Sequence, residues 1–146
     1  MSIIVDANCA VEALNATPTA DFAPLLKAIL TGAHKLTVGG TKQKRECQRL
    51  GQVWRFLKIL DQAGRSRLVG DASVDQEERR VAIEVKIESD DPHILALARI
   101  SGARILCSRD QALYADFTNP MIITAPRGRV YQNASHARLL ATAKKK

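Results

Sequence analysis

The fold is decided by residues 89–111, SDDPHILALARISGARILCSRDQ, where a predicted helix leads into a predicted buried strand. Asp91 and Pro92 favour a helix start, because aspartate is a preferred cap and proline suits the first helical position. Apolar residues at helical spacing follow, and Gly102 is typical of a helix end. The run ARILCS at 103–108 has the composition of a buried strand, and the residues after it begin another helix. This helix–strand–helix unit is characteristic of α/β proteins.

Strands and helices alternate along the rest of the chain as well, which predicts one α/β domain with a central parallel sheet. Residues 81–87 alternate in polarity and fit a strand as well as a helix. The other expected elements are strands at 3–8, 34–40 and, if short, 67–71; helices at 21–32, at about 42–63 with Thr41 as cap, and from a capping box of Ser73 and Gln76; a late strand in MIITAP followed by an extension or hairpin in RVYQN; and a final short helix in ASHARLLATA.

The composition is that of a globular protein, with 46% apolar and 25% charged residues. No apolar run approaches the roughly 18 residues of a membrane span, and the N-terminus lacks the basic region of a signal peptide. Three widely spaced cysteines show no disulfide or zinc spacing. We therefore expect a cytoplasmic protein without membrane contact, with reduced cysteines in its core and a disordered basic tail at about 142–146.

The formal net charge of +7 favours a polyanionic partner, above all nucleic acid. Its distribution is uneven. The segment from Lys42 to Arg67 holds eight basic residues against two acidic ones, Glu46 and Asp61. We expect a phosphate backbone to bind near this segment.

Four acidic residues lie where predicted strands end or where helices next to them begin. Asp6 ends the first strand, Asp110 follows ARILCS, Asp91 precedes the helix that leads into that strand, and Glu46 lies one turn into the helix after the second strand. Ligand sites in open α/β sheets form beyond the carboxyl ends of the strands, so these side chains should converge. Two carboxylates about 4 Å apart repel by about 4 kcal/mol at an effective dielectric of 20. A hard divalent cation, Mg²⁺ or Mn²⁺, is expected to offset this repulsion.

Each of three acids also has a simpler interpretation. Asp91 and Asp110 could be helix caps and nothing more, and Glu46 could be a solvated charge among its basic neighbours. Asp6 is harder to explain in this way, because it follows an apolar run with no cation nearby in sequence. His93 has no catalytic-triad context, and we interpret it as an ordinary helix residue.

The acidic blocks resemble those of PIN-domain nucleases, which include VapC-like ribonuclease toxins. IIVDAN with Glu46 about 40 residues later, SDDPHILALA and LCSRDQALYADF match the four blocks, and the resemblance covers nearly the whole chain. Its most specific part is residues 89–117. The resemblance implies a three-layer α/β/α fold and Mg²⁺- or Mn²⁺-dependent cleavage of single-stranded RNA.

The family's functional residues can be carried over onto matching positions. Asp90 competes with Asp91 for the third acid, and we prefer Asp91 because it lies in better helical register with Ile94 and Ala98. The resemblance implies Asp6, Glu46, Asp91 and Asp110 as catalytic and metal-binding acids, Asp116 as an additional metal acid, and Asn8, Asp90 and Ser108 as supporting residues; we expect Lys42, Arg45, Arg49 and Arg109 to contact RNA.

The mechanism implied by the resemblance is in-line attack of a metal-activated water on the phosphodiester, which leaves a 5′-phosphate and a 3′-hydroxyl. The implied partners are RNA, an antitoxin protein if the chain is the toxin of a toxin–antitoxin pair, and a second copy in a homodimer. Two alternatives stay open. One is a PIN-like module that binds RNA or protein without cutting it, and the other is a structure-specific DNA nuclease with the same metal chemistry.

Overall fold

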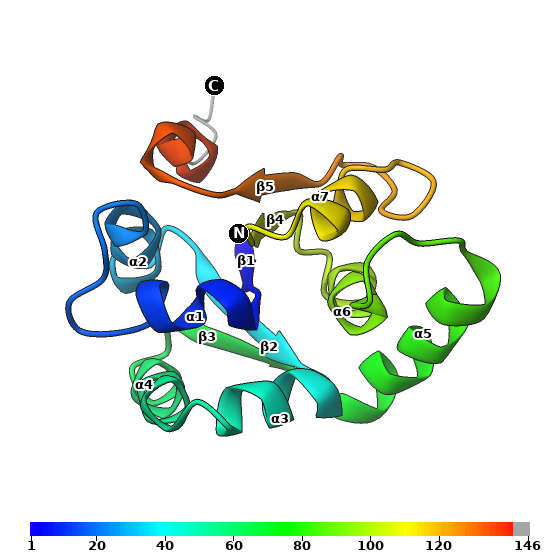
Figure 1. Cartoon of the computed structure of the whole chain (residues 1–146). Helices are drawn as coiled ribbons and strands as arrows, with labels where there is room; N and C mark the ends of the chain where they lie inside the picture. Colours follow the sequence, from blue (N-terminus) through cyan, green and yellow to red (C-terminus); the bar gives the residue numbers. More distant parts are fainter. Residues whose placement is uncertain (142–146) are drawn as a thin grey trace.

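Residues 1–141, which the computed structural model describes, form a five-stranded parallel sheet with helices on both faces (Figure 1). The sheet order is β3-β2-β1-β4-β5, and every pair of neighbours is parallel. The predicted α/β class with a parallel sheet is therefore confirmed, while the tail expected at 142–146 lies outside the described residues. The strands are β1 Ser2–Val5, β2 Lys35–Gly39, β3 Ser66–Val69, β4 Ile105–Cys107 and β5 Arg129–Tyr131.

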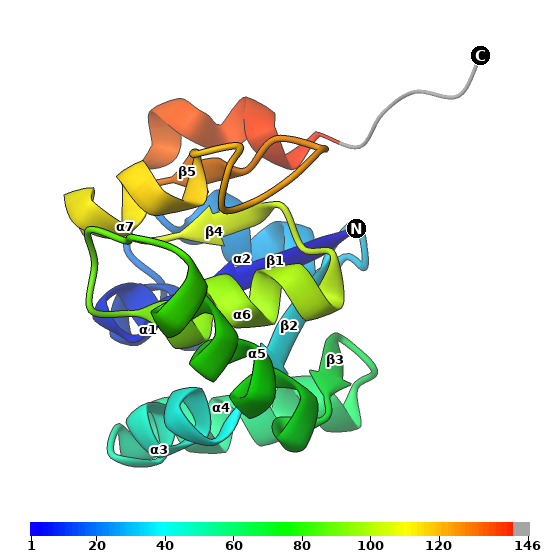
Figure 2. The ribbon, with the colours of Figure 1, turned by 90° about the vertical axis from the view of Figure 1, so that its right-hand side faces the viewer.

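Two apolar clusters lie on opposite faces of the sheet and give a three-layer α/β/α architecture (Figure 2). The alternation of side chains along a strand explains the division, because Ile3 and Val5 of β1 enter one cluster and Ile4 enters the other. Helices α1, α2 and α4 cover the first face, and α5, α6 and α7 cover the second. The helices are α1 Ala7–Ala13, α2 Ala23–Leu30, α3 Thr41–Gln48, α4 Gly51–Gln62, α5 Asp71–Glu84, α6 Pro92–Ser101, α7 Gln111–Phe117 and the 3₁₀ helix η1 Ala134–Leu140.

The strand order reverses next to β1, and this reversal positions the site. The chain runs from β1 outward to β2 and β3, then crosses back to β4 on the other side of β1. Connections therefore leave β1 and β4 in opposite directions, which is the topological switch point where α/β folds bind ligands. The backbone N–H of Asp6 still donates to the Cys107 carbonyl at 2.9 Å, so the two strand ends stay in register up to this point.

The long helix expected over 42–63 is instead two helices, α3 and α4, separated at Arg49 and Leu50. Leu50 leaves the helical conformation with φ −103° and ψ 80°, and it packs against the first apolar cluster. Gly51 follows, and glycine is a weak helix former that tolerates such a break. The break lets α4 bury its apolar side while α3 carries Glu46 toward the switch point.

Both predicted helix caps in this half of the molecule are wrong. Helix α3 begins at Thr41 after Gly40, whose φ of 92° favours glycine. The Thr41 hydroxyl instead donates to the Asp75 carboxylate at 2.6 Å. Helix α5 begins at Asp71, so the predicted capping box of Ser73 and Gln76 lies inside it.

Residues 81–87 belong to a helix as far as Glu84, which decides the ambiguity left by the sequence. The segment MIITAP is not a strand. Ile122 and Ile123 are buried in the second cluster, but their N–H groups donate to the Asn119 carbonyl within a turn. RVYQN forms no hairpin either, since β5 pairs in parallel with β4. The final short helix is present as the 3₁₀ helix η1.

All three cysteines are buried and free, as predicted. Among residues 1–141, no helix combines the length and the apolar character that a membrane crossing requires.

Candidate metal centre

The site begins with Asp6, which directly follows β1 and is only 6% exposed. Its side chain does not cap α1. Instead the Ser108 hydroxyl donates to Asp6 Oδ2 at 2.9 Å, and the backbone N–H of Asp110 donates to the same hydroxyl oxygen at 3.1 Å. Ser108 therefore links the first and fourth predicted acids across the ends of β1 and β4.

Asp110 caps α7, as the simpler interpretation of this residue required. One carboxylate oxygen, Oδ1, accepts from the backbone N–H groups of Ala112 at 2.9 Å and Leu113 at 3.2 Å. A carboxylate has two oxygens, so Oδ2 remains able to bind a cation. Capping and metal binding are thus compatible at this residue.

Asp91, rather than Asp90, belongs to the site. Asp91 stands at the cap position of α6, yet its side chain makes no capping hydrogen bond. An oxygen of its carboxylate lies within 4.8 Å of ligand atoms of Glu46 and His93. Asp90 is exposed, and Lys42 Nζ donates to its backbone carbonyl, not to its carboxylate, at 3.5 Å. Of the two neighbouring aspartates, Asp91 is therefore the one whose carboxylate lies near Glu46 and His93.

Glu46 and His93 come together from α3 and α6, with 3.1 Å between Glu46 Oε1 and His93 Nε2. The imidazole is 1% exposed, and burial lowers the pKa of His93 to about 4. His93 is therefore neutral at pH 7, and Nε2 carries the proton that it donates to the carboxylate. Its Nδ1 atom is buried without a hydrogen-bond partner.

His93 is the site residue that the sequence interpretation missed. Because no catalytic triad accompanies it, the sequence predicts an ordinary helix residue at this position. The available signal was its place two residues after Asp91, in the first turn of the same helix, where it reaches the same end of the sheet. The contact with Glu46 joins residues 47 positions apart, and nothing in the local sequence of either residue indicates it.

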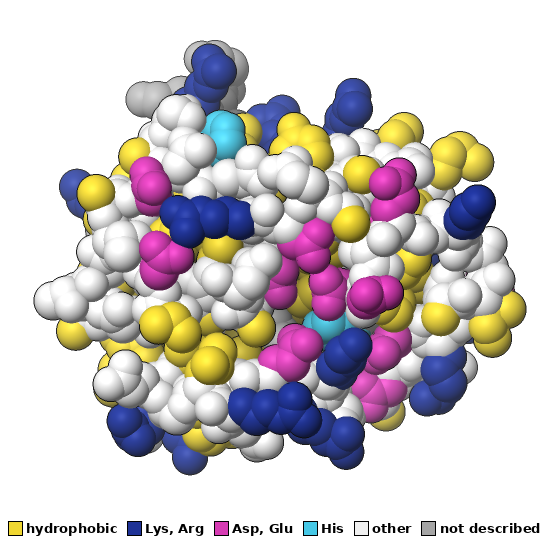
Figure 3. Space-filling model, viewed as in Figure 1, with side chains coloured by type: hydrophobic (Ala, Val, Ile, Leu, Met, Phe, Trp, Pro, Cys, Tyr) yellow, Lys and Arg dark blue, Asp and Glu magenta, His cyan; other side chains and the backbone are white. Residues whose placement is uncertain are grey.

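The acids act on one another electrostatically. Burial raises the pKa of Asp6, and the charges of Glu46 and Asp110 raise it further against the opposing hydrogen bond from Ser108. Burial also raises the pKa of Asp91, with Asp6, Glu46 and Asp110 adding to the effect. The structure thus brings the four predicted acids into one group. Figure 3 shows acidic side chains gathered around a histidine near the middle of this face, with basic side chains beside them.

Asp116 does not join this group. It is 2% exposed, and its two carboxylate oxygens accept from the backbone N–H groups of Glu88 at 2.8 Å and Ser89 at 2.9 Å. The residue predicted as an additional metal ligand therefore holds the loop that precedes Asp91. Asn8, predicted as a supporting residue, is exposed in the first turn of α1.

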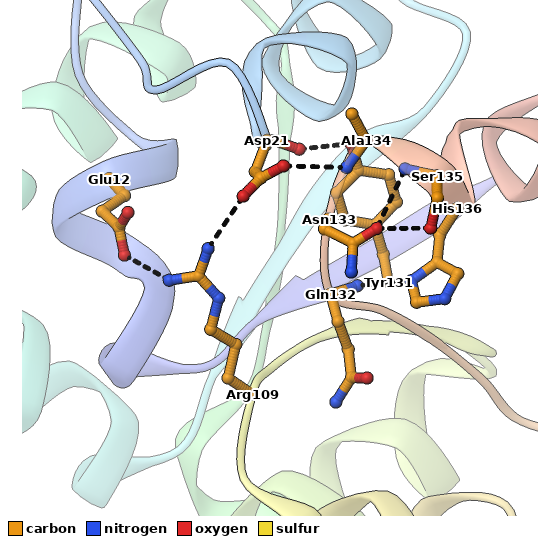
Figure 4. A network of polar contacts seen from close by, with 9 residues as sticks. All are labelled: Glu12, Asp21, Arg109, Tyr131, Gln132, Asn133, Ala134, Ser135 and His136. Atoms are coloured by element: carbon orange, nitrogen blue, oxygen red, sulfur yellow. Dashed lines mark hydrogen bonds and ion pairs between the residues drawn. The ribbon is translucent and has the colours of Figure 1, made fainter.

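Arg109, predicted to contact RNA, is engaged in a structural network instead (Figure 4). Its guanidinium pairs with Glu12 at 2.8 Å and Asp21 at 3.3 Å, and it lies 4.7 Å above the Phe22 ring. Asp21 also accepts from the backbone N–H of Ala134. The network ties the β4–α7 connection to α1, to the segment before α2 and to η1.

The other three basic residues predicted to contact RNA border the acidic group. Lys42, Arg45 and Arg49 line a cavity of about 420 Å³, together with Glu46 of the site. Asp75, Glu78 and Arg79 also line it, so the cavity carries both signs of charge. A phosphate held by the three cations would lie next to Glu46.

The donor set can hold a metal ion. Glu46, Asp91 and His93 each offer a ligand atom within 4.8 Å of the others. Asp6 and Asp110 do not belong to this group of three, but their charges raise the pKa of Asp91. Carboxylates suit Mg²⁺ and Mn²⁺. A metal ion bound to His93 Nε2 would take the place of the proton that this atom donates to Glu46. A divalent cation would also offset the burial and the repulsion that together raise the pKa values of Asp6 and Asp91.

The variant Asp91→Asn is expected to stabilise the metal-free protein. A raised folded-state pKa means that the Asp91 carboxylate lowers stability as pH rises from about its ordinary value of 3.8 through the raised value. In EDTA at neutral pH, the melting temperature should therefore rise by about 2–4 °C, and the difference should vanish as the pH falls toward 4. Circular-dichroism melts across this pH range measure it. The exposed neighbour serves as control, since Asp90→Asn should change little, and a destabilised Asp91→Asn protein would contradict the assigned repulsion.

Comparisons of the chain with protein-family models, with curated proteins and with solved structures find no match. Its function is therefore inferred from the chemistry of this centre.

Proposed function

We propose that the protein is a Mg²⁺- or Mn²⁺-dependent endoribonuclease that hydrolyses single-stranded RNA. The observation that carries the proposal is the convergence of Asp6, Glu46, Asp91 and Asp110 at the switch point of the sheet, with pKa values raised at Asp6 and Asp91. Burial and mutual repulsion raise the pKa values of Asp6 and Asp91, so their charged forms lower the stability of the metal-free protein. Perturbed titratable groups of this kind are characteristic of functional sites.

The residues of the site would have different roles in hydrolysis. Asp6, Asp91 and Asp110 would bind the cation through carboxylate oxygens that neither Ser108 nor the α7 cap occupies. Glu46, held by the His93 N–H, would complete the set or orient the attacking water. When bound, a divalent cation polarises the phosphodiester and lowers the pKa of the attacking water.

The substrate class follows from charge. A net charge of +7 attracts nucleic acid, and Lys42, Arg45 and Arg49 flank Glu46 where a phosphodiester backbone would approach the acids. A module that only binds RNA would gain nothing from four carboxylates in the same place, because they repel the phosphates. Hydrolysis therefore explains the arrangement better than binding alone.

The narrower biological role rests on the sequence resemblance. If the chain is the toxin of a toxin–antitoxin pair, an antitoxin protein would cover the acidic centre, and a homodimer is the expected assembly. Co-purification with the product of a neighbouring gene, followed by loss of RNA cleavage in the complex, tests this role.

RNA cleavage should depend on the divalent cation. We expect Mn²⁺ to support cleavage of a single-stranded RNA, and EDTA to reduce the rate at least about 100-fold, since the cation supplies several kcal/mol of transition-state stabilisation. Products should carry 5′-phosphate and 3′-hydroxyl ends, which end-labelling distinguishes. Single-stranded and flap DNA of the same sequence serve as parallel substrates. Activity that survives EDTA, or activity confined to DNA, would overturn the proposal.

A further inference from the structure

A second cavity, of about 370 Å³, lies between α7, β5 and η1 and has a uniform charge. Among the residues that line it are Arg127, Arg129, Arg138 and His136, and none is acidic. The cavity beside Glu46 differs in this respect, because Asp75 and Glu78 oppose its cations. The second cavity is thus suited to an anion, because no carboxylate in its lining competes for the arginines.

The three arginines are not used by the fold. Arg127, Arg129 and Arg138 are exposed, and within residues 1–141 their side chains make no hydrogen bond or ion pair. Other arginines of the chain behave differently, as Arg104 donates to four backbone carbonyl groups. Three unpaired guanidinium groups around one hollow are strong donors for phosphate oxygens.

Gly128 explains how two of these arginines reach the cavity. A Cβ at this position would overlap the Phe117 carbonyl oxygen and ring, so only glycine lets the chain pass this close to the end of α7. Arg127 and Arg129 flank it on either side. The backbone that carries both arginines is therefore held against the end of α7.

The cavity also offers groups suited to a base or ribose. Tyr114 is 40% exposed, and an exposed tyrosine ring provides a stacking surface that tolerates any base. His136 accepts the backbone N–H of Gln132 at Nδ1, at 3.0 Å. The neutral ring therefore carries its proton on Nε2, which remains able to donate.

We propose that this cavity, which we call the arginine pocket, binds a nucleotide of the single-stranded RNA next to the one that is cut. Tyr114 follows Asp110 by one turn of α7, since its N–H donates to the Asp110 carbonyl at 2.9 Å, and one turn spans about 5.4 Å. An RNA strand that extends from the acidic centre along α7 would therefore reach the arginine pocket with its next nucleotide. The arginines would bind its phosphates, and Tyr114 would stack on its base. This inference rests on the proposed function for its choice of RNA, but RNA binding can be measured without cleavage.

Fluorescence anisotropy in EDTA, with a short fluorescein-labelled single-stranded RNA, tests the pocket in the full chain. The triple variant Arg127→Ala, Arg129→Ala, Arg138→Ala should weaken binding about 30-fold, and the slope of log affinity against log salt should fall by about 2. The triple variant Lys35→Ala, Arg55→Ala, Lys58→Ala removes the same charge from exposed sites outside the pocket and should weaken binding less than about 3-fold. Thermal melts of both variants establish that they are folded.

A second variant separates base recognition from charge. Tyr114→Ala should weaken RNA binding about tenfold and leave binding of inorganic polyphosphate unchanged. A photo-crosslinkable RNA should label the peptide that contains Tyr114. Three results would contradict nucleotide binding in the arginine pocket. They are equal losses of RNA affinity in the two charge variants, no RNA binding in EDTA, and unchanged RNA affinity of Tyr114→Ala. None of these results depends on whether Mn²⁺ supports cleavage, so the pocket and the nuclease proposal fail separately.

Discussion

Replacing Asp110 with Asn is expected to lower Mn²⁺-dependent RNA cleavage by about 10³-fold while leaving the protein folded. The amide oxygen of Asn can still accept the N–H groups of Ala112 and Leu113 that Asp110 now caps. What is lost is the negative charge and the second carboxylate oxygen. The variant therefore separates the two roles of Asp110. Initial rates of cleavage and a thermal melt, measured on the same preparation, give both readouts.

Asp6→Asn should show the same loss, since the Asn amide oxygen can keep the 2.9 Å hydrogen bond from Ser108. Asp90→Asn is the matched control, because its side chain is exposed beside the site and should leave the rate within about 2-fold. Full activity of Asp6→Asn and Asp110→Asn together would end the proposal of metal-dependent hydrolysis.

His93→Ala is expected to reduce Mn²⁺ affinity and cleavage by about 10–100-fold. The substitution removes the N–H that holds Glu46 at 3.1 Å and frees that carboxylate to turn away. Isothermal titration with Mn²⁺ reports the loss without any cleavage assay.

His93→Gln separates positioning from packing. A Gln amide can place an N–H near the position of Nε2, so this variant should recover most of the Mn²⁺ affinity that His93→Ala loses. A buried His93→Ala change also leaves a cavity, which costs stability at any site and is seen in the melting temperature. If His93→Gln binds Mn²⁺ as poorly as His93→Ala, the Glu46 contact is not the reason for the effect.

Local signals were sufficient for the helix–strand–helix unit at residues 89–111. Asp91-Pro92, the apolar spacing after it and Gly102 predicted α6, whose observed bounds are Pro92–Ser101 with Gly102 in the left-handed conformation. ARILCS contained β4. The place of Asp6, Asp110 and Glu46 at the carboxyl ends of strands followed from alternation of elements alone, because parallel strands end at one edge of the sheet.

Tertiary packing determines the features of the fold and the site that the sequence did not predict. The break between α3 and α4 depends on Leu50 reaching the core, which helical periodicity across 42–63 conceals. The segment MIITAP has a strand-like composition, but its isoleucines are buried within a turn that the Asn119 carbonyl holds. His93 and Asp116 acquire their roles from partners 47, 27 and 28 residues away.

Asp116 accepts hydrogen bonds from the backbone N–H groups of Glu88 and Ser89 and so fixes the loop before Asp91 to α7. One rigid cylinder, α7, carries Asp110 at its start and Asp116 near its end, so the fourth acid and the loop leading to Asp91 are clamped to the same body. The backbone positions of Asp91 and Asp110 are therefore coupled through α7. We expect this coupling to preorganise the acidic group, so that a divalent cation would bind with little rearrangement of the backbone around it.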